Sequence, residues 1–316
     1  GIPTMGRAER FPEIFEYLMK LSIERPITLF IDEFQEFFKV NKSVYSDMQR
    51  IWDMYHTKAH INLIVCGSIF SMMTKIFKDK KEPLYNRQTR FMSIKPFTPA
   101  VLKEIMAEYN PNYTAEDLLA LYSFTGGVAK YVQLLVDAGA TTKTKMLNHI
   151  IKADSVFLSE GKAILIEEFG KDYGVYFSIL SAIARGKTLR SEIEQIVGRE
   201  IGGYLTKLEK EYEVITKNQP IFEKSSTKNV RYTIEDNFFT FWFRFIYKYN
   251  YMLEIENFDA VKTIINRDYE TFSGKMLERY FKRVLMESKA YTRIGSWWDR
   301  KGENEIDIVA ENELND

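Results

Sequence analysis

The stretch "ITLFIDEFQEFF", residues 27–38, decides the fold of the N-terminal part of the chain. Its first five residues form a nearly continuous apolar run, which is typical of a strand buried on both faces of a sheet. Two carboxylates, Asp32 and Glu33, follow where this strand ends. In open α/β sheets ligands bind at the carboxyl ends of the strands. The stretch therefore predicts a sheet edge at which the two acids work on a ligand.

Composition sets the limits of the protein class. A chain of 316 residues predicts two or three domains, and 45% hydrophobic residues provide an ample core. Lys and Arg number 44, as do Asp and Glu, so a zero net charge argues against a bulk polyanion binder but allows a local basic face. The single cysteine, Cys66, indicates a reducing compartment. No apolar stretch approaches a membrane span of about 20 residues. We expect a cytoplasmic α/β protein without a membrane partner.

The apolar pattern around the opening stretch predicts a parallel βαβ unit. Residues 10–23 have helical spacing, and Pro26 ends that helix and starts the strand 27–31. A second amphipathic helix, 43–57, leads to a second apolar run, 61–68. A helix over 69–77 and a further strand within 87–99 complete the predicted core.

The rest of the chain divides by pattern into three further parts. Residues 100–170 read as consecutive helices, interrupted by glycines at 126, 127 and 139, and predict a helical lid. Three helical stretches and two β-rich pieces in 171–236 outline a winged helix-turn-helix. Residues 237–316 begin very aromatic and end in the strand-like "NEIDIVAEN". The predicted fold is a multidomain combination of α/β and α+β classes, with an α/β core over residues 1–99.

Several motifs together resemble one family. The strings "LFIDEFQEF", "NLIVCGSIFSMM", "KPFTP" and "FTGGVAKYV" are similar to those of archaeal and bacterial DEXX-box ATPases, which are AAA-related P-loop proteins with a parallel sheet, a winged helix and a C-terminal restriction-endonuclease-like domain. This resemblance implies ATP and Mg²⁺ as ligands. It makes Asp32 the Mg²⁺-holding residue, Glu33 the general base for the attacking water, and Ser68 a sensor of phosphate or water. Arg87 and Arg90 would be arginine fingers for a neighbour's nucleotide, which implies a homo-oligomer.

Each of these residues also has a structural interpretation. Asp32 or Glu33 is equally placed to cap the helix that follows the strand, and Ser68 to cap the helix after the second strand. Arg87 and Arg90 are alternatively exposed arginines beside a strand. Ala129 stands where the family often has proline after its paired glycines, which is a small departure.

A phosphate-binding loop, G-x-x-x-x-G-K-[ST], should precede such a strand. The nearest string, "ARGKTLRS" at 184–191, has Ser181 in place of the first glycine and a helix–turn–helix context, so we interpret it as a turn and helix cap. Only 26 residues precede the strand 27–31. We expect the phosphate-binding half of the site to lie outside this sequence, and residues 1–316 alone not to bind ATP in the usual way.

The C-terminal part carries a second group of acids. Glu278 lies in a predicted helix, and Glu305 and Asp307 alternate on a predicted strand, so both point to one face. This arrangement resembles the PD-(D/E)xK nucleases, in which carboxylates gather Mg²⁺ around a phosphodiester. No lysine stands at the E-x-K spacing after Asp307. We expect a nuclease-like but incomplete domain, rather than an edge strand with solvated acids.

Basic residues of the predicted winged helix are candidates for nucleic-acid contacts. Residues 185–231 hold 10 basic and 7 acidic side chains, a mild surplus that favours phosphate binding no more than protein contacts. The candidates are Arg199, Lys207, Lys210, Lys228 and Arg231.

The sequence therefore predicts ATP binding and hydrolysis coupled to binding or processing of double-stranded DNA. Two alternatives stay open. One is a non-enzymatic winged-helix DNA-binding or scaffold protein, and the other is a metal-dependent nuclease.

Overall fold

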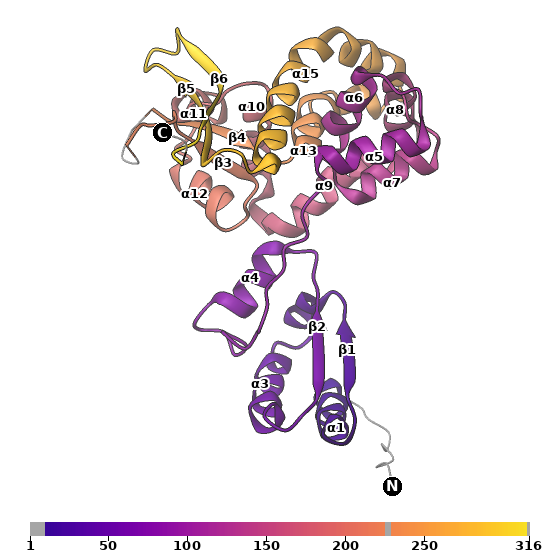
Figure 1. Cartoon of the computed structure of the whole chain (residues 1–316), viewed down its shortest axis with the longest axis vertical. Coiled ribbons are helices and arrows are strands. Elements are labelled where there is room, and N and C mark those ends of the chain that lie inside the picture. Colours follow the sequence, from indigo (N-terminus) through magenta and orange to yellow (C-terminus); the bar gives the residue numbers. More distant parts are fainter. Residues whose placement is uncertain (1–9, 225–228, 315–316) are drawn as a thin grey trace. The chain divides into compact units, whose positions relative to one another are not determined.

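The computed structural model describes residues 10–224 and 229–314. The chain divides into two compact units, Gly1–Ser93 and Ile94–Asp316, whose elements are labelled in Figure 1. Each unit has its own hydrophobic core.

Unit 1 is built around two parallel strands. Its elements are, in chain order, α1 (Phe11–Glu24), β1 (Ile27–Ile31), the short 3₁₀ helix η1 (Phe34–Glu36), α2 (Phe37–Val40), α3 (Ser43–Tyr55), β2 (Ile61–Val65) and α4 (Phe70–Lys78). β1 and β2 pair in parallel, with Ile27 opposite Ile61 and Ile31 opposite Val65. The predicted βαβ unit is therefore present, and helices α1 and α3 pack against each other.

The prediction that both faces of these strands are buried is wrong for the part of unit 1 that the structure describes. Leu29 and Leu63 pack on the core formed with α1, α3 and α4. Phe30 is 58% exposed and its register partner Ile64 is 42% exposed. Alternate residues of a strand point to opposite faces, and the helices here cover only one of them.

The predicted strand within 87–99 is also wrong. That segment has no regular secondary structure until α5 begins at Pro99. Met92 and Ile94 are exposed, at 66% and 86%. The apolar pattern is that of a strand, but no neighbouring strand among the described residues pairs with it.

Unit 2 begins with five helices, and glycines stand where two of these helices end, as predicted. Gly126, which follows α6, and Gly139, which follows α7, have φ of +61° and +63°. Gly127 is required for a second reason, because a Cβ there would lie 2.4 Å from the backbone oxygen of Phe97. The five helices are α5 (Pro99–Tyr109), α6 (Ala115–Thr125), α7 (Ala129–Asp137), α8 (Lys143–Ile150) and α9 (Val156–Phe169).

Three helices and an antiparallel hairpin come next, in the predicted order. In the hairpin, Ile215 lies opposite Ile234 and Asn218 opposite Arg231. Gly186 and Lys187 lie in the turn between α10 and α11, so "ARGKTLRS" is not a phosphate-binding loop. After η2 (Gly170–Asp172), the elements are α10 (Tyr173–Ala184), α11 (Arg190–Val197), α12 (Gly202–Lys210), β3 (Ile215–Asn218) and β4 (Arg231–Ile234).

The aromatic segment after β4 forms the centre of unit 2. Phe238 packs on Tyr131 of α7 with ring centroids 4.1 Å apart, and Phe241 packs on Phe124 of α6 at 4.8 Å. The remaining elements are α13 (Asn237–Phe241), the π-helical turn η3 (Trp242–Tyr247), α14 (Asn250–Leu253), the long α15 (Phe258–Ser288), and the antiparallel strands β5 (Arg293–Trp298) and β6 (Glu305–Glu311). One continuous core extends from α5 to α15, and α15 runs beside α6 (Figure 1). The three predicted parts of unit 2 therefore share a core, and the boundaries drawn between them stay predictions.

Candidate active site

Asp32 lies where β1 ends, at the carboxyl edge of the parallel pair. Its Oδ1 accepts hydrogen bonds from the Cys66 thiol, with Sγ at 2.7 Å, and from the backbone N–H of Glu33 at 2.8 Å. The thiol's hydrogen bond and then the Glu33 N–H lower the pKa of Asp32. The same contact with Asp32 raises the pKa of the Cys66 thiol. Asp32 is thus an exposed, ionised carboxylate held by two donors.

Glu33 has a backbone that few residues other than glycine adopt. Its φ is +47°, in the left-handed region. The next N–H, of Phe34, donates to the backbone oxygen of Cys66 at 2.8 Å, so the turn is bonded to the loop that follows β2. This conformation sends the chain out of the sheet directly into η1.

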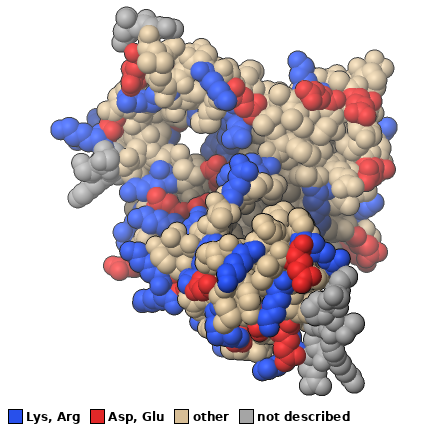
Figure 2. All heavy atoms as spheres, turned by 60° about the horizontal axis from the view of Figure 1, so that its bottom comes forward, with Lys and Arg blue, Asp and Glu red and all other residues tan. Residues whose placement is uncertain are grey.

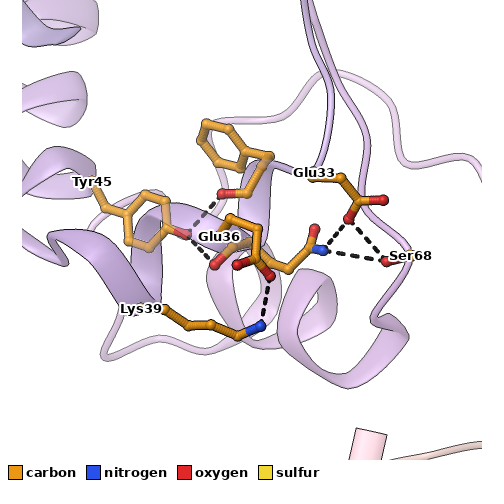
Figure 3. Close-up of polar contacts among 7 residues, drawn as sticks. Glu33, Glu36, Lys39, Tyr45 and Ser68 are labelled. Carbon is orange, nitrogen blue, oxygen red and sulfur yellow. Dashed lines mark hydrogen bonds and ion pairs between the residues drawn. The ribbon is translucent and has the colours of Figure 1, made fainter. Parts of the chain in front are cut away.

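The Glu33 carboxylate is held from the neighbouring strand (Figure 3). Ser68, three residues after β2 ends, donates its hydroxyl proton to Glu33 Oε2 at 2.9 Å. The amide of Gln35 donates to the same oxygen. Neither Glu33 nor Ser68 caps a helix: η1 starts after Glu33, and α4 after Ile69, without a side-chain cap. The structure therefore brings the Glu33 carboxylate and the Ser68 hydroxyl together, and the roles expected of them stay predictions.

Gln35 is a site residue that the sequence reasoning missed. It is 1% exposed, and its Nε2 donates to Glu33 and, at 3.3 Å, to Ser68 Oγ. The carbonyls of Phe34 and Gln35 in turn accept from the buried Tyr45 hydroxyl, at 3.0 and 3.4 Å. The available signal was an amide within a run of aromatic side chains, where burial of a polar group indicates a hydrogen-bonding role.

Arg87 and Arg90 lie outside this group of contacts. Arg87 forms a bidentate ion pair with Asp53 of α3, at 2.9 and 2.8 Å. Its guanidinium also donates to the carbonyls of Pro83 and Tyr85. Asp53 raises the pKa of Arg87. Its guanidinium therefore has a structural role inside unit 1, whereas Arg90 is exposed.

The C-terminal acids approach one another without forming a metal site. Burial, and then the charge of Asp307, raise the pKa of Glu278 on α15. Burial lowers the pKa of Lys282, one helical turn further on, whose ammonium donates to Ser296. Within residues 10–224 and 229–314, no group of three or more His, Cys, Asp or Glu side chains is close enough to hold a metal ion. Electrostatic effects reach further than coordination bonds, so Glu278, Glu305 and Asp307 influence one another but are not arranged as ligands.

The predicted nucleic-acid contacts differ in how accessible they are. Lys207 and Lys210 of α12 are exposed, as is Arg199, which lies over the Tyr204 ring at 5.4 Å. Arg231 is not a free phosphate ligand, because its guanidinium pairs with Glu305 at 2.7 Å and stacks 4.5 Å above Trp298. Lys228 lies outside the described residues. Basic and acidic side chains intermingle on the face drawn in Figure 2.

Across the described ranges, we find no helix with the length and apolar character needed to cross a bilayer.

Two family models match the chain. One, described as an ATPase domain predominantly from Archaea, matches residues 7–135. The other, described as archaeal and bacterial proteins of unknown function, matches residues 242–316.

Individual proteins match as well. The "Uncharacterized protein MJECL04" of Methanocaldococcus jannaschii is 33% identical over 98% of this chain and 69% of its own length. The "Uncharacterized protein MJ0424" of the same organism is 34% identical over 18% of this chain and 54% of its own length. A solved structure, described as the Walker-type ATPase PABY2304 of Pyrococcus abyssi, aligns with a TM-score of 0.53 and 19% identity over 74% of this chain and 68% of that one. At that identity the likeness shows a shared fold.

Proposed function

This chain belongs to an archaeal P-loop ATPase family, and on that premise we propose that the intact protein hydrolyses ATP at the site formed by Asp32, Glu33 and Ser68. The observation that carries the proposal is the Glu33 carboxylate, held at 2.9 Å by Ser68 from the adjacent strand end. A capping acid would bond to its own helix instead. A carboxylate fixed at the carboxyl edge of a parallel pair is placed to act on a ligand.

Glu33 is the proposed general base. Both hydrogen bonds to its carboxylate end on Oε2, so Oε1 is the oxygen proposed to take the proton of water. The oxygen of that water attacks the γ-phosphorus, the bond from the γ-phosphorus to the bridging oxygen breaks, and ADP leaves with the bond's electrons. Ser68 and Gln35 keep the base in place while the proton moves.

The surroundings of Asp32 fit a magnesium ion. Mg²⁺ binds oxygen ligands, keeps several waters, and in nucleotide sites uses one or two carboxylates together with the phosphates. Asp32 supplies an exposed carboxylate whose pKa is lowered and whose two hydrogen bonds both use Oδ1. When bound there, the ion would neutralise charge that develops on the phosphate oxygens.

Replacing Glu33 by glutamine tests this proposal. The full-length protein with Glu33→Gln is expected to lose about 10²–10⁴-fold in ATP turnover, the usual contribution of a general base, while nucleotide affinity is kept. Glu36→Gln is the matched control, because Glu36 lies three residues on, has a half-exposed side chain and pairs with Lys39 on its own helical turn at 2.7 Å (Figure 3). A Glu33→Gln protein that turns over ATP at the unaltered rate would refute the assignment.

Coupling to DNA is a second candidate function, supported by the helices and hairpin of 173–234. We propose that they form a winged helix whose α12 contacts phosphates through Lys207 and Lys210, both exposed. The hairpin is also joined to the β5–β6 pair, through Ile221 N–H to the Ser296 carbonyl at 2.7 Å and through Arg231. A duplex bound by α12 would therefore contact a region that is hydrogen-bonded to the β5–β6 pair.

Salt dependence of DNA binding tests this second proposal. Each phosphate contact contributes about −0.9 to the slope of log affinity against log salt, so removing two lysines should reduce the slope by about 2. The test protein carries Lys207→Ala and Lys210→Ala, and its control carries Lys103→Ala and Lys145→Ala, two exposed lysines of α5 and α8. Equal slopes in the two proteins would favour the non-enzymatic scaffold in which this region contacts protein.

The metal-dependent nuclease is the weakest of the three functions. Glu278, Glu305 and Asp307 do not form a metal-holding group among the described residues, so we derive no step from a metal there. Its test is plasmid nicking by the full-length protein with Mg²⁺, and loss of nicking on Asp307→Ala.

A further inference from the structure

We propose that Gln35 is a positioning residue, which fixes the Glu33 carboxylate and the Ser68 hydroxyl relative to each other; this rests on the proposed ATP hydrolysis. The three side chains close a triangle of hydrogen bonds. Gln35 Nε2 donates to Glu33 Oε2 and to Ser68 Oγ at 3.3 Å, and Ser68 Oγ donates to Glu33 Oε2 at 2.9 Å. The dashed lines that meet at Glu33 and Ser68 in Figure 3 show this triangle.

The three side chains act as donors and acceptors toward one another. The amide nitrogen of Gln35 faces both acceptor atoms, the Glu33 carboxylate oxygen and the Ser68 hydroxyl oxygen. The Ser68 hydroxyl accepts one of these bonds and donates its only proton to Glu33. No member can turn without breaking a bond to both others, so the triangle fixes the direction in which Glu33 presents its second oxygen.

The burial of Gln35 shows that the amide is not there for packing. The residue is 1% exposed, and its carbonyl Oε1 is buried without a hydrogen-bond partner among the described residues. An apolar side chain of the same shape would avoid the cost of burying that oxygen. The amide is therefore retained at a position where packing alone favours leucine or methionine.

Gly67 provides the space for this amide. A Cβ at position 67 would lie 2.1 Å from Gln35 Oε1 and 2.7 Å from the sulfur of Met73. Because Gly67 directly precedes Ser68, the loop after β2 brings both the hydroxyl and the open space to Gln35. The loop that holds Gly67 and Ser68 thus accommodates the Gln35 side chain, which lies more than 30 residues earlier in the sequence.

The experiment measures kcat and KM for ATP in the full-length protein with Gln35→Leu. Loss of an outer partner of a site carboxylate typically costs about 10–100-fold, and we expect that loss in kcat, with the KM for ATP unchanged and the unfolding temperature kept or raised. Gln49→Leu is the matched control, a half-buried glutamine of α3 in the same unit, and should leave kcat unchanged.

A pH profile separates positioning from a structural role. In Gln35→Glu the new side chain donates to Glu33 only when protonated, and two adjacent carboxyls that share a proton titrate at raised pH. We expect the rate of this variant, relative to the unaltered protein, to rise about tenfold as the pH falls from 8 to 6. A purely structural role predicts a ratio that does not change with pH.

Gly67→Ala displaces the same amide by adding a Cβ beside it. This variant tests the inference if Gln35→Leu does not fold. It should lower kcat as Gln35→Leu does. The inference is overturned if Gln35→Leu folds and turns over ATP at the unaltered rate, or if the Gln35→Glu ratio is flat. Failure of the proposed function gives a different result: the unaltered protein does not hydrolyse ATP, or the Glu33→Gln protein hydrolyses ATP at the unaltered rate.

Discussion

Removing one buried hydroxyl should weaken the turn that carries Glu33. Tyr45 of α3 is fully buried, and its hydroxyl donates to the carbonyl of Phe34 at 3.0 Å, with the Gln35 carbonyl 3.4 Å away. Burial raises the pKa of this hydroxyl to about 12, so it remains a neutral donor at any pH used in an assay. Tyr45→Phe removes the donor and keeps the ring, which packs on Phe34 with centroids 5.4 Å apart.

The expected loss of stability comes from the buried carbonyl that the substitution leaves without a donor. A buried acceptor left without its donor costs about 1–3 kcal/mol, and the ring contact contributes no change. We therefore expect unit 1 to lose about 2 kcal/mol of unfolding free energy. For a unit of 93 residues, each kcal/mol lowers the unfolding midpoint by about 4–8 °C.

Calorimetry of the unaltered and variant proteins measures this loss. Tyr55→Phe is the control, since the Tyr55 hydroxyl donates to Glu16 at 3.2 Å near the surface, where water replaces the lost partner. Its expected change is within about 0.5 kcal/mol. A Tyr45→Phe protein as stable as the Tyr55→Phe protein would show that the carbonyls of the Glu33 turn do not depend on Tyr45.

Three further substitutions test unit 2. Gly161→Ala would place a Cβ 2.5 Å from the indole of Trp242 and should destabilise the protein by about 1–3 kcal/mol in denaturant unfolding, whereas Gly174→Ala, in open space on α10, should stabilise it slightly. Burial raises the pKa of Asp236, the N-cap of α13, to about 6 from 3.8, so the folded state keeps a proton that the unfolded state releases, and stability falls as the pH rises from about 4 to 6. Asp236→Asn keeps a capping side chain and lacks the charge. The unfolding free energy of this variant, relative to the unaltered protein, should therefore grow by about 3 kcal/mol across that interval. A difference between the two proteins that stays constant with pH would contradict this reasoning.

The strands of unit 1 were predictable because their signals are local. The apolar runs that begin at Ile27 and Ile61 leave few alternatives to strands, and Pro26 fixes where the first begins. A helix between two such runs is the usual connection of two parallel strands. The exposed face of Phe30 and Ile64 was not predictable, because an apolar run does not show whether one face or both are covered.

The site was only half predictable, because its contacts are not local. Asp32, Glu33 and Ser68 stand at strand ends, where sequence position alone indicates a functional edge. The placement of Gln35 requires the left-handed backbone of Glu33 and the proximity of Gly67, and a sequence pattern shows neither the backbone angle nor the contact. The same holds for Arg87, whose partner Asp53 lies 34 residues earlier. The arginine-finger role followed from the family resemblance, and only the fold reveals the ion pair.

The two groups of acids differ in how far the protein has prepared them for chemistry. Each carboxylate at the end of β1 already receives two hydrogen bonds from its own unit, and their donors come from both strands' loops. Catalysis depends on such preorganisation, because groups fixed beforehand need no rearrangement when charge develops. Among the described residues, no side-chain donor holds Glu278 of α15 or Asp307 of β6 in this way, and Glu305 is paired with Arg231 of the hairpin. An acid that pairs with a basic residue of the hairpin contributes to holding β3–β4 and β5–β6 together. We therefore expect loss of Glu305 to loosen that connection, and loss of the Glu33 carboxylate to lower ATP turnover by about 10²–10⁴-fold.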